Sequence, residues 1–278
     1  MAHLQRKNFA ARSSVLDPNG PVVSLTSYGK RIRTVHLTLE SIAAGSLRPS
    51  RLLLWLEDAN VVAKPPAALR RLQERGLEIL GCENFGPHKK YFPYLESKAS
   101  FEDALVTADD DVLYPSFWLT GLLTAHRRAP AAVHCYRAHV AELADARTPA
   151  FLPYERWQAC QTTQPSFLNF STGCSGVIFP APVLSALKAS GRGFVDCCPF
   201  ADDVWLNLHA QRMGFPVAQV SDVPYRFFGI LLTQLSGLFR KNLFHGGNDA
   251  ALAATYSAPD LLRLATAAHE PVTRSHCA

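Results

Sequence analysis

Long apolar runs are missing from this 278-residue sequence. A helix that crosses a bilayer needs about 20 consecutive apolar residues, and no stretch of the chain reaches that length, which excludes a multi-pass membrane protein. Hydrophobic residues nevertheless make up 48% of the chain and charged residues 18%. That balance allows a sizeable core and excludes disorder, collagen and coiled coil, so we expect one large α/β domain or two small ones.

A basic tail is also missing. The chain has 28 Lys and Arg residues against 23 Asp and Glu residues, and the resulting formal charge of +5 is spread along the sequence. A mild, dispersed positive charge suits a small anionic ligand better than a nucleic-acid backbone. We therefore expect no nucleic-acid partner.

Paired cysteine motifs and a secretory signal are absent too. The seven cysteines are odd in number and include no CxxC spacing, and residues 1–20 carry polar side chains where a signal peptide has its apolar stretch. We expect free thiols in a reducing, cytoplasmic compartment. The adjacent Cys197 and Cys198 fit small buried side chains better than a redox or metal site.

What the sequence does contain is an alternation of strand-like and helix-like segments. Strands are expected at 21–27, 52–56, 77–80, 105–108, 131–136, 176–179 and 216–220. Helices are expected at 34–44, 65–76, 95–105, 115–126, 182–190 and 202–213, and a long loop over the site at 146–170. This alternation predicts a mostly parallel sheet with helices on both faces.

The chain shows no repeat, low-complexity segment or linker. We expect a polar leader at 1–20, a single domain at 21–250 and a C-terminal helix or tail at 251–278. The apolar segment 227–239, flanked by Arg226 and Arg240, is too short to span a bilayer. It favours a buried element that covers the sheet, and it also permits an interfacial helix in peripheral contact with a membrane.

Three consecutive aspartates, Asp109, Asp110 and Asp111, follow the strand expected at 105–108. Three adjacent carboxylates repel one another unless a positive charge or open water lies beside them. A solvated turn is one interpretation. The carboxyl edge of a parallel strand is also where open α/β sheets bind ligands, and oxygen donors spaced two apart suit Mg²⁺ or Mn²⁺. The metal interpretation is favoured over the turn.

Several short segments occur in an order that resembles bacterial glycosyltransferases of the GT-A fold: 24–29 (SLTSYG), 86–94 (GPHKKYFPY), 108–115 (ADDDVLYP), 173–180 (GCSGVIFP) and 201–206 (ADDVWL). The resemblance implies one Rossmann-type α/β domain with a mostly parallel sheet flanked by helices. It also implies an inverting enzyme that transfers a sugar from a nucleotide-diphosphate sugar to a hydroxyl of a glycan or lipid-linked glycan acceptor, in surface polysaccharide biosynthesis.

The same resemblance assigns a metal site. It implies that Asp109 and Asp111 bind Mn²⁺ or Mg²⁺, which bridges the donor diphosphate, and that His245 completes the metal shell. Because the run holds three aspartates, its register stays open. Asp110 either shares in the donor site or points toward backbone or solvent.

Cationic side chains near the expected sheet edge are candidates for the donor diphosphate. Lys89 or Lys90 can reach it as a point charge, although surface lysine pairs are most often only solvated. Arg31 and Arg33 follow the loop of the first strand and are candidates for the same anion, with an exposed helical position as the equal alternative.

Other donor-site candidates are uncharged or acidic. Thr26 and Tyr28 belong to the first strand and its loop, and Asp58 ends the second strand beside Glu57, where a turn carboxylate is an equally good interpretation. Gly176 offers a close backbone approach to a sugar, and a tight turn explains it almost as well.

Asp202 and Asp203 begin a predicted helix. Helix capping accounts for one of them. The resemblance implies that Asp203 is the general base for the acceptor hydroxyl and that Asp202 supports the cap or the acceptor. Tyr154 and Trp157 are candidates for stacking on a sugar ring, and Trp205 fits the core better.

Two other functions remain open. A nucleotidyltransferase also uses paired aspartates with Mg²⁺, and a non-catalytic nucleotide- or glycan-binding domain keeps the same fold without turnover.

Overall fold

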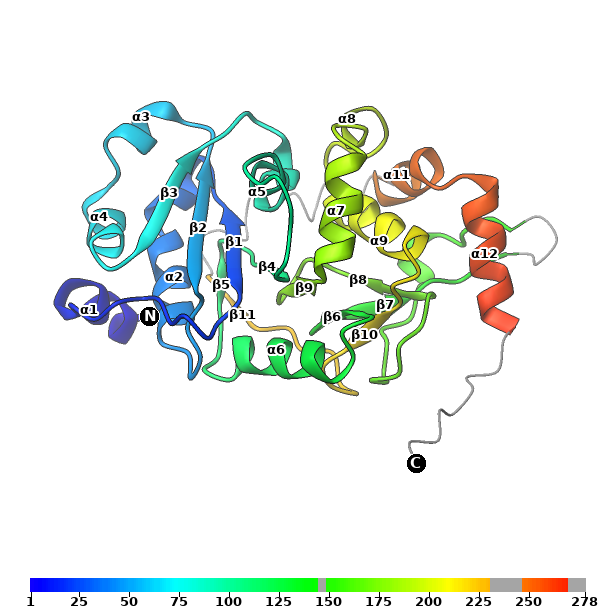
Figure 1. Cartoon of the computed structure of the whole chain (residues 1–278), viewed down its shortest axis with the longest axis horizontal. Coiled ribbons are helices and arrows are strands. Elements are labelled where there is room, and N and C mark those ends of the chain that lie inside the picture. Colours follow the sequence, from blue (N-terminus) through cyan, green and yellow to red (C-terminus); the bar gives the residue numbers. More distant parts are fainter. Residues whose placement is uncertain (145–148, 231–246, 270–278) are drawn as a thin grey trace.

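A computed structural model describes residues 1–144, 149–230 and 247–269. A seven-stranded sheet runs through the molecule in the order β10-β6-β9-β4-β1-β2-β3 (Figure 1). Its strands are β1 (Val22–Thr26), β2 (Arg51–Leu56), β3 (Leu77–Gly81), β4 (Leu105–Thr107), β6 (Val133–Cys135), β9 (Val177–Phe179) and β10 (Val217–Gln219). β9 runs antiparallel to both of its neighbours, β4 and β6, whereas the other pairs are parallel. The expected mostly parallel α/β fold is confirmed.

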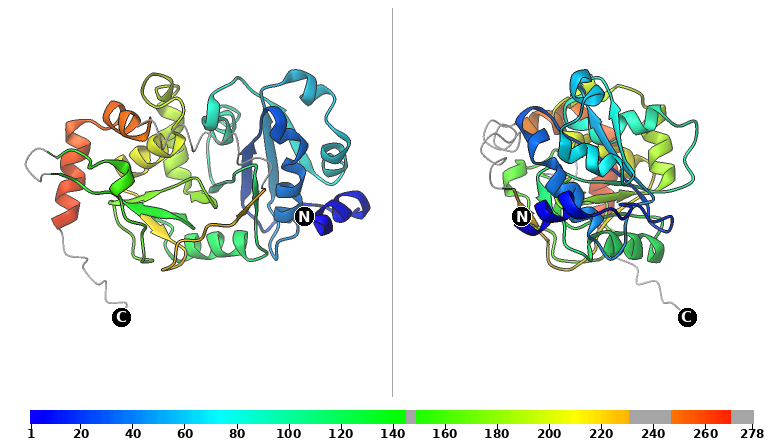
Figure 2. Two further views of the ribbon diagram at one scale, coloured as in Figure 1. Left: turned by 180° about the vertical axis from the view of Figure 1, so that it is seen from behind. Right: turned by 90° about the vertical axis from the view of Figure 1, so that its left-hand side faces the viewer.

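Helices cover both faces of the sheet. One face packs against α2 (Val35–Ala43), α4 (Ala67–Gln73) and α6 (Trp118–Arg128), and the other against α5 (Phe92–Glu96), α7 (Ala181–Ala189) and α9 (Asp202–Arg212). Successive strand residues point to opposite faces, so Leu52 and Leu54 join one core while Leu53 and Trp55 join the other. Figure 2 shows the same layers from behind, with α6 across the sheet from α7.

Smaller elements complete the fold. They are α1 (Ala2–Ala10), α3 (Ala59–Ala63), α8 (Phe194–Cys197), α11 (Gly247–Thr255), α12 (Ala258–His269), the 3₁₀ turns η1 (Gly29–Arg33), η2 (Gly86–Lys90) and η3 (Tyr154–Arg156), and two antiparallel pairs, β5 (Val112–Leu113) with β11 (Phe228–Gly229) and β7 (Ala138–Val140) with β8 (Asn169–Ser171). α1 and α12 lie at opposite ends of the long axis (Figure 1). None of the described helices is long and apolar enough to cross a membrane.

The segment 1–20, expected as a polar leader, packs against the domain. Asn8 is fully buried and donates from its side chain to Glu40 at 3.0 Å. Glu40 also pairs with Arg75 at 2.6 Å, and both of these side chains are buried. A buried ion pair and its amide partner therefore fasten α1 beside α2 and α4.

The helix expected at 95–105 is wrong. α5 spans Phe92–Glu96 and ends there. The Ser97 hydroxyl donates to the carbonyl of Tyr94 at 2.8 Å, and the Lys188 ammonium donates to the carbonyl of Lys98. The Ser97 bond satisfies a carbonyl in the last turn of α5, and the Lys188 bond satisfies one just beyond it.

The loop expected at 146–170 is correct for most of its described part. Its end forms β8, which pairs with β7, and its middle holds the turn η3. Of the apolar segment 227–239, Phe228 and Gly229 form β11, and the part from 231 onward lies outside the described residues.

A candidate active site at the carboxyl edge of the sheet

Five segments meet at one edge of the sheet. The chain runs from β1 outward to β3 and returns to β4 on the other side of β1, so the loops after β1 and β4 diverge at a topological switch point. Because β9 is reversed, the turn 173–176 before it lies at this same edge. The turn η2 and the start of α9 reach the edge from the helical layer.

Asp110 fastens the loop after β4 to the loop after β1. Its buried carboxylate accepts hydrogen bonds from the Ser27 hydroxyl at 2.6 Å and from Arg31 at 2.7 Å, and its carbonyl accepts one from Thr38 at 2.9 Å. Burial raises the pKa of Asp110, while the Arg31 charge and the Ser27 hydrogen bond oppose that rise. The middle aspartate therefore points into the protein and holds Arg31 in place.

Asp109 and Asp111 are more open than Asp110. Their side chains are 22% and 19% exposed, against 5% for Asp110. Oδ1 of Asp109 lies 3.1 Å from Lys90 Nζ, and Oδ2 of Asp111 lies 3.2 Å from Arg31 Nη2. The outer two carboxylates thus face the edge, each beside a cation.

The two adjacent lysines of η2 have different partners. Lys90 is buried, and its Nζ lies 3.1 Å from both Asp109 and Asp202. Burial alone would lower the pKa of Lys90, but these two carboxylates raise it well above its ordinary value. Lys89 pairs with Glu57 instead. Of the two lysines, Lys90 is the one that meets the aspartates.

Two cationic side chains lie over the ring of Tyr28. The Arg31 guanidinium carbon lies 5.4 Å from its ring centroid, and Lys89 Nζ lies 5.8 Å from it. The ring is partly exposed, and both distances fit cation–π attraction. The loop after β1 and the turn η2 are thereby joined over the end of β1.

Asp203 faces the turn before β9. Its Oδ1 accepts a hydrogen bond from the backbone N–H of Gly173 at 2.8 Å. Burial raises the pKa of Asp203 to about 8, and the charge of Asp202 adds to the rise while Lys90 opposes it. Asn207 donates to the Asp203 carbonyl at 2.7 Å and to the Ser171 carbonyl at 2.8 Å, which fixes α9 against β8.

The expected helix cap is wrong. The N-cap of α9 is Ala201, and neither Asp202 nor Asp203 makes a side-chain capping bond. Both residues lie in the first turn, where a negative charge complements the helix dipole. Asp202 pairs with Lys90, so the two adjacent carboxylates have separate partners.

Two of the donor-site candidates have structural roles. The Thr26 hydroxyl donates to the Trp55 carbonyl, which binds β1 to β2. Gly176 has a φ of +94°, and a Cβ there would lie 2.6 Å from Nε1 of Trp118. The close approach at Gly176 is to that indole ring.

Two further candidates lie in exposed positions. Asp58 is exposed and caps α3 by accepting from the backbone of Asn60 at 2.9 Å. Arg33 is exposed, and its side chain makes no hydrogen bond or ion pair with the described residues. Of the aromatic candidates, Trp157 and Trp205 are buried in the core, whereas Tyr154 is only partly buried.

The expected metal site is partly outside the described structure. His245 lies in the segment 231–246, which is not described. Among the described residues, no three His, Cys, Asp or Glu side chains gather in a metal-binding arrangement. Asp109 and Asp111 supply two hard oxygen donors, and Mg²⁺ is commonly held by one or two carboxylates together with substrate phosphates. The donor set fits such an ion when a diphosphate completes its shell.

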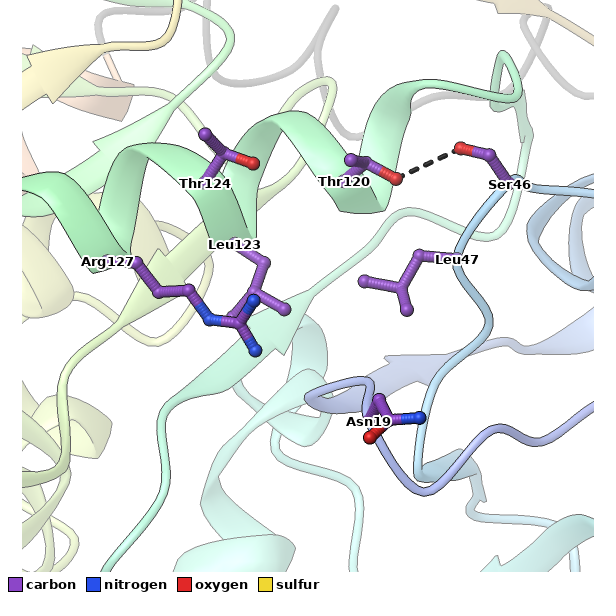
Figure 3. Close-up of a pocket in the computed structure, with 7 residues that line it drawn as sticks. All are labelled: Asn19, Ser46, Leu47, Thr120, Leu123, Thr124 and Arg127. Atoms are coloured by element: carbon purple, nitrogen blue, oxygen red, sulfur yellow. Dashed lines mark hydrogen bonds between the residues drawn. The ribbon is translucent and has the colours of Figure 1, made fainter.

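A pocket elsewhere on the molecule lacks this chemistry. Asn19, Ser46 and Leu47 line it from the segments before β1 and β2, and α6 provides the remaining wall (Figure 3). Ser46 and Thr120 hydrogen-bond across it at 3.0 Å. Its seven lining residues include no carboxylate, and it lies at the amino ends of the strands, away from the aspartates.

Comparison with known proteins identifies the fold. No protein-family model and no curated protein matches this chain. Among solved structures, 4-diphosphocytidyl-2C-methyl-D-erythritol synthase from Anaerococcus prevotii DSM 20548 is 12% identical and covers 83% of this chain and 97% of its own, with a TM-score of 0.50. The chain shares the Rossmann-like α/β fold of that synthase.

A second solved structure is CMP:2-keto-3-deoxy-manno-octonic acid synthetase complexed with CTP. It is 14% identical and covers 84% of this chain and 97% of its own, with a TM-score of 0.44.

Sequence reasoning missed Arg137, which lies two residues after the end of β6 at the same edge of the sheet. The signal was available, because a charged residue after a predicted strand is placed like Asp109 after β4. It also missed that the backbone of Gly173 positions Asp203.

Proposed function

We propose that this protein is a glycosyltransferase that moves a sugar from a nucleotide-diphosphate donor to a hydroxyl group of a glycan or lipid-linked glycan. The observation that carries the proposal is the placement of Asp203. An acid whose pKa is raised to about 8 is held by the Gly173 N–H at the ligand edge of the sheet, where the charges of Lys90 and Asp109 both act on it. A base for a neutral hydroxyl works best when its pKa is near the working pH.

The donor diphosphate is assigned to the side of the site where cations gather. Arg31 is held by Asp110, and Lys90 is held by Asp109 and Asp202, so both positive charges are fixed before a donor binds. Preorganised charge of this kind stabilises the anionic leaving group without reorganisation. Asp109 and Asp111 would hold Mg²⁺ or Mn²⁺, which would supply Lewis-acid stabilisation of the leaving diphosphate.

The acceptor is assigned to the side of Asp203. Its Oδ1 is held by the Gly173 N–H, so the carboxylate is oriented toward the turn before β9. Once ionised, it takes the proton of the attacking hydroxyl as the oxygen bonds to the anomeric carbon and the bond to the diphosphate breaks. Attack opposite the leaving group inverts the anomeric configuration.

Nucleotidyl transfer is the second candidate, and the shared fold favours it. The similar synthase is named for a diphosphocytidyl product. Such a reaction attacks the α-phosphorus of a nucleoside triphosphate and releases pyrophosphate. A nucleophile that is already an anion needs no general base. Nucleotidyl transfer to such a nucleophile therefore does not account for the raised pKa of Asp203.

Product analysis separates these functions. The protein is incubated with a panel of nucleotide sugars or nucleoside triphosphates, with glycan acceptors and with Mn²⁺ or EDTA. Acceptor-dependent release of nucleoside diphosphate supports glycosyl transfer. Pyrophosphate release from a triphosphate overturns it in favour of nucleotidyl transfer. Saturable nucleotide binding without turnover of any donor overturns both and supports a non-catalytic domain.

A further inference from the structure

Arg137 lies at the ligand edge of the sheet without a carboxylate partner among the described residues. Its Nη1 donates to the Thr172 hydroxyl at a long 3.4 Å, and it forms no ion pair with a described Asp or Glu. By contrast, five arginines each pair with a carboxylate: Arg31, Arg51, Arg75, Arg192 and Arg212. A partly buried guanidinium with a single weak hydroxyl partner retains most of its capacity to bind an anion.

Arg137 lies beside the turn that holds Asp203. The Arg137 carbonyl accepts from the backbone N–H of Thr172 at 3.1 Å, and the next residue, Gly173, donates to Asp203 at 2.8 Å. Cys174 follows in the same turn and is exposed. The charges of Arg137 and Asp203 both act on the Cys174 thiol, so the guanidinium and the carboxylate both lie near this turn.

Aromatic rings form the adjoining wall. Tyr154 stacks on His139 with ring centroids 5.4 Å apart and planes 16° from parallel. The charges of Asp203 and Arg137 both act on the Tyr154 hydroxyl. Burial, and then the Arg137 charge, lowers the pKa of His139 to about 4, so this histidine is neutral near pH 7. Arg137 therefore supplies a positive charge beside this wall, whereas His139 does not.

We propose that Arg137 binds an anionic group, a carboxylate or a phosphate, on the acceptor whose hydroxyl Asp203 deprotonates. The inference rests on the proposed function and adds the chemical class of the acceptor. An arginine binds either group through two parallel N–H bonds. Arg137 follows β6, which β9 and β4 separate from β1 and the Arg31 loop, and it adjoins the turn that holds Asp203. This position assigns it to the acceptor rather than to the donor diphosphate.

Calorimetric titration tests the inference without turnover. The probes are glucuronate, glucose 6-phosphate and glucose, and the proteins are wild type, Arg137→Met, Arg137→Lys and Arg128→Met. Arg128 is exposed at the end of α6 and provides the matched loss of one charge. Wild type and Arg128→Met should bind at least one anionic probe more tightly than glucose. The probe that binds more tightly identifies the anionic group as a carboxylate or a phosphate.

Arg137→Met should weaken binding of that anion by roughly 10- to 100-fold, the usual range for a lost charge-assisted hydrogen bond, and leave glucose unchanged. Arg137→Lys should recover part of the loss. Equal binding of the anion by Arg137→Met and wild type, with unchanged melting, overturns the inference, as does an equal loss in Arg128→Met. If the donor panel shows no transfer but anion binding still depends on Arg137, the proposed function fails and the anion site stands.

Discussion

The side chain of Asp203 accepts a hydrogen bond from the backbone of Gly173, 30 positions earlier in the sequence, at 2.8 Å. The bond joins the start of α9 to the turn that enters the reversed strand β9. It orients the carboxylate, while burial holds its pKa near 8. A single residue thus combines a fixed direction with a pKa suited to accepting a proton near neutral pH.

The rate should depend on pH through this group. Only the ionised carboxylate accepts a proton, so kcat/KM should rise with pH and level off above about 8. Initial rates at low donor and acceptor concentrations between pH 6 and 9.5 measure this limb. A flat pH profile in wild type, or the same rise with pH in Asp203→Asn, contradicts the assignment of Asp203 as the base.

Stability should change with pH in the opposite direction. The folded protein keeps the Asp203 proton up to about 8, whereas an unfolded Asp releases it near 3.9. Between these values the folded state binds more protons, so this group's contribution to the free energy of unfolding falls as pH rises. Urea unfolding at pH 5 and pH 8.5 should show a smaller decrease in Asp203→Asn than in wild type. An identical decrease in both proteins argues against the raised pKa.

The buried ion pair under α1 should matter far more than an exposed one. Arg75→Met leaves Glu40 charged and buried, which should cost about 3–5 kcal/mol of unfolding free energy. Arg51→Met breaks a pair whose side chains are each 36% exposed and should cost about 0–1 kcal/mol. Denaturant melts of the two variants compare them directly, and equal losses would contradict the role given to the buried pair.

Asp111→Asn tests the metal site. The substitution keeps size but removes a charged oxygen donor. Losing even an outer partner of a bound metal weakens its affinity by roughly 10- to 100-fold, so transfer at limiting Mn²⁺ should fall at least that far. Asp103→Asn, an exposed carboxylate in the loop before β4, is the control. Full activity of Asp111→Asn at low Mn²⁺, or full wild-type activity in EDTA, would contradict a metal at this position.

Local sequence patterns predicted the sheet well. Buried strands such as β1 and β2 are short, mostly apolar runs, so their positions follow from the sequence. The helix at 95–105 failed because Ser97 and Lys188 satisfy backbone groups that the expected helix would have used, and Lys188 is distant in sequence. Such non-local hydrogen bonds leave no periodic signal.

The candidate site was predictable in its residue types but not in its pairings. The spacing of the three aspartates indicated that the side chains of Asp109 and Asp111 point to one side and that of Asp110 to the other. The structure shows Asp110 turned inward. That Lys90 rather than Lys89 meets the aspartates depends on the geometry of η2, which the adjacent positions in sequence do not reveal. The reversal of β9, which brings Gly173 to Asp203, is a property of the whole sheet.

The most direct measurement compares donor binding with transfer in Asp203→Asn. Neither Asp202 nor Asp203 caps α9, so the substitution should leave the fold intact. We predict that donor affinity by calorimetry stays near wild type in the presence of Mn²⁺, while transfer falls by about 10²- to 10⁴-fold, the range for losing a general base. Transfer at the wild-type rate, or a loss of donor affinity that matches the loss of rate, would contradict the assignment of Asp203 as the base.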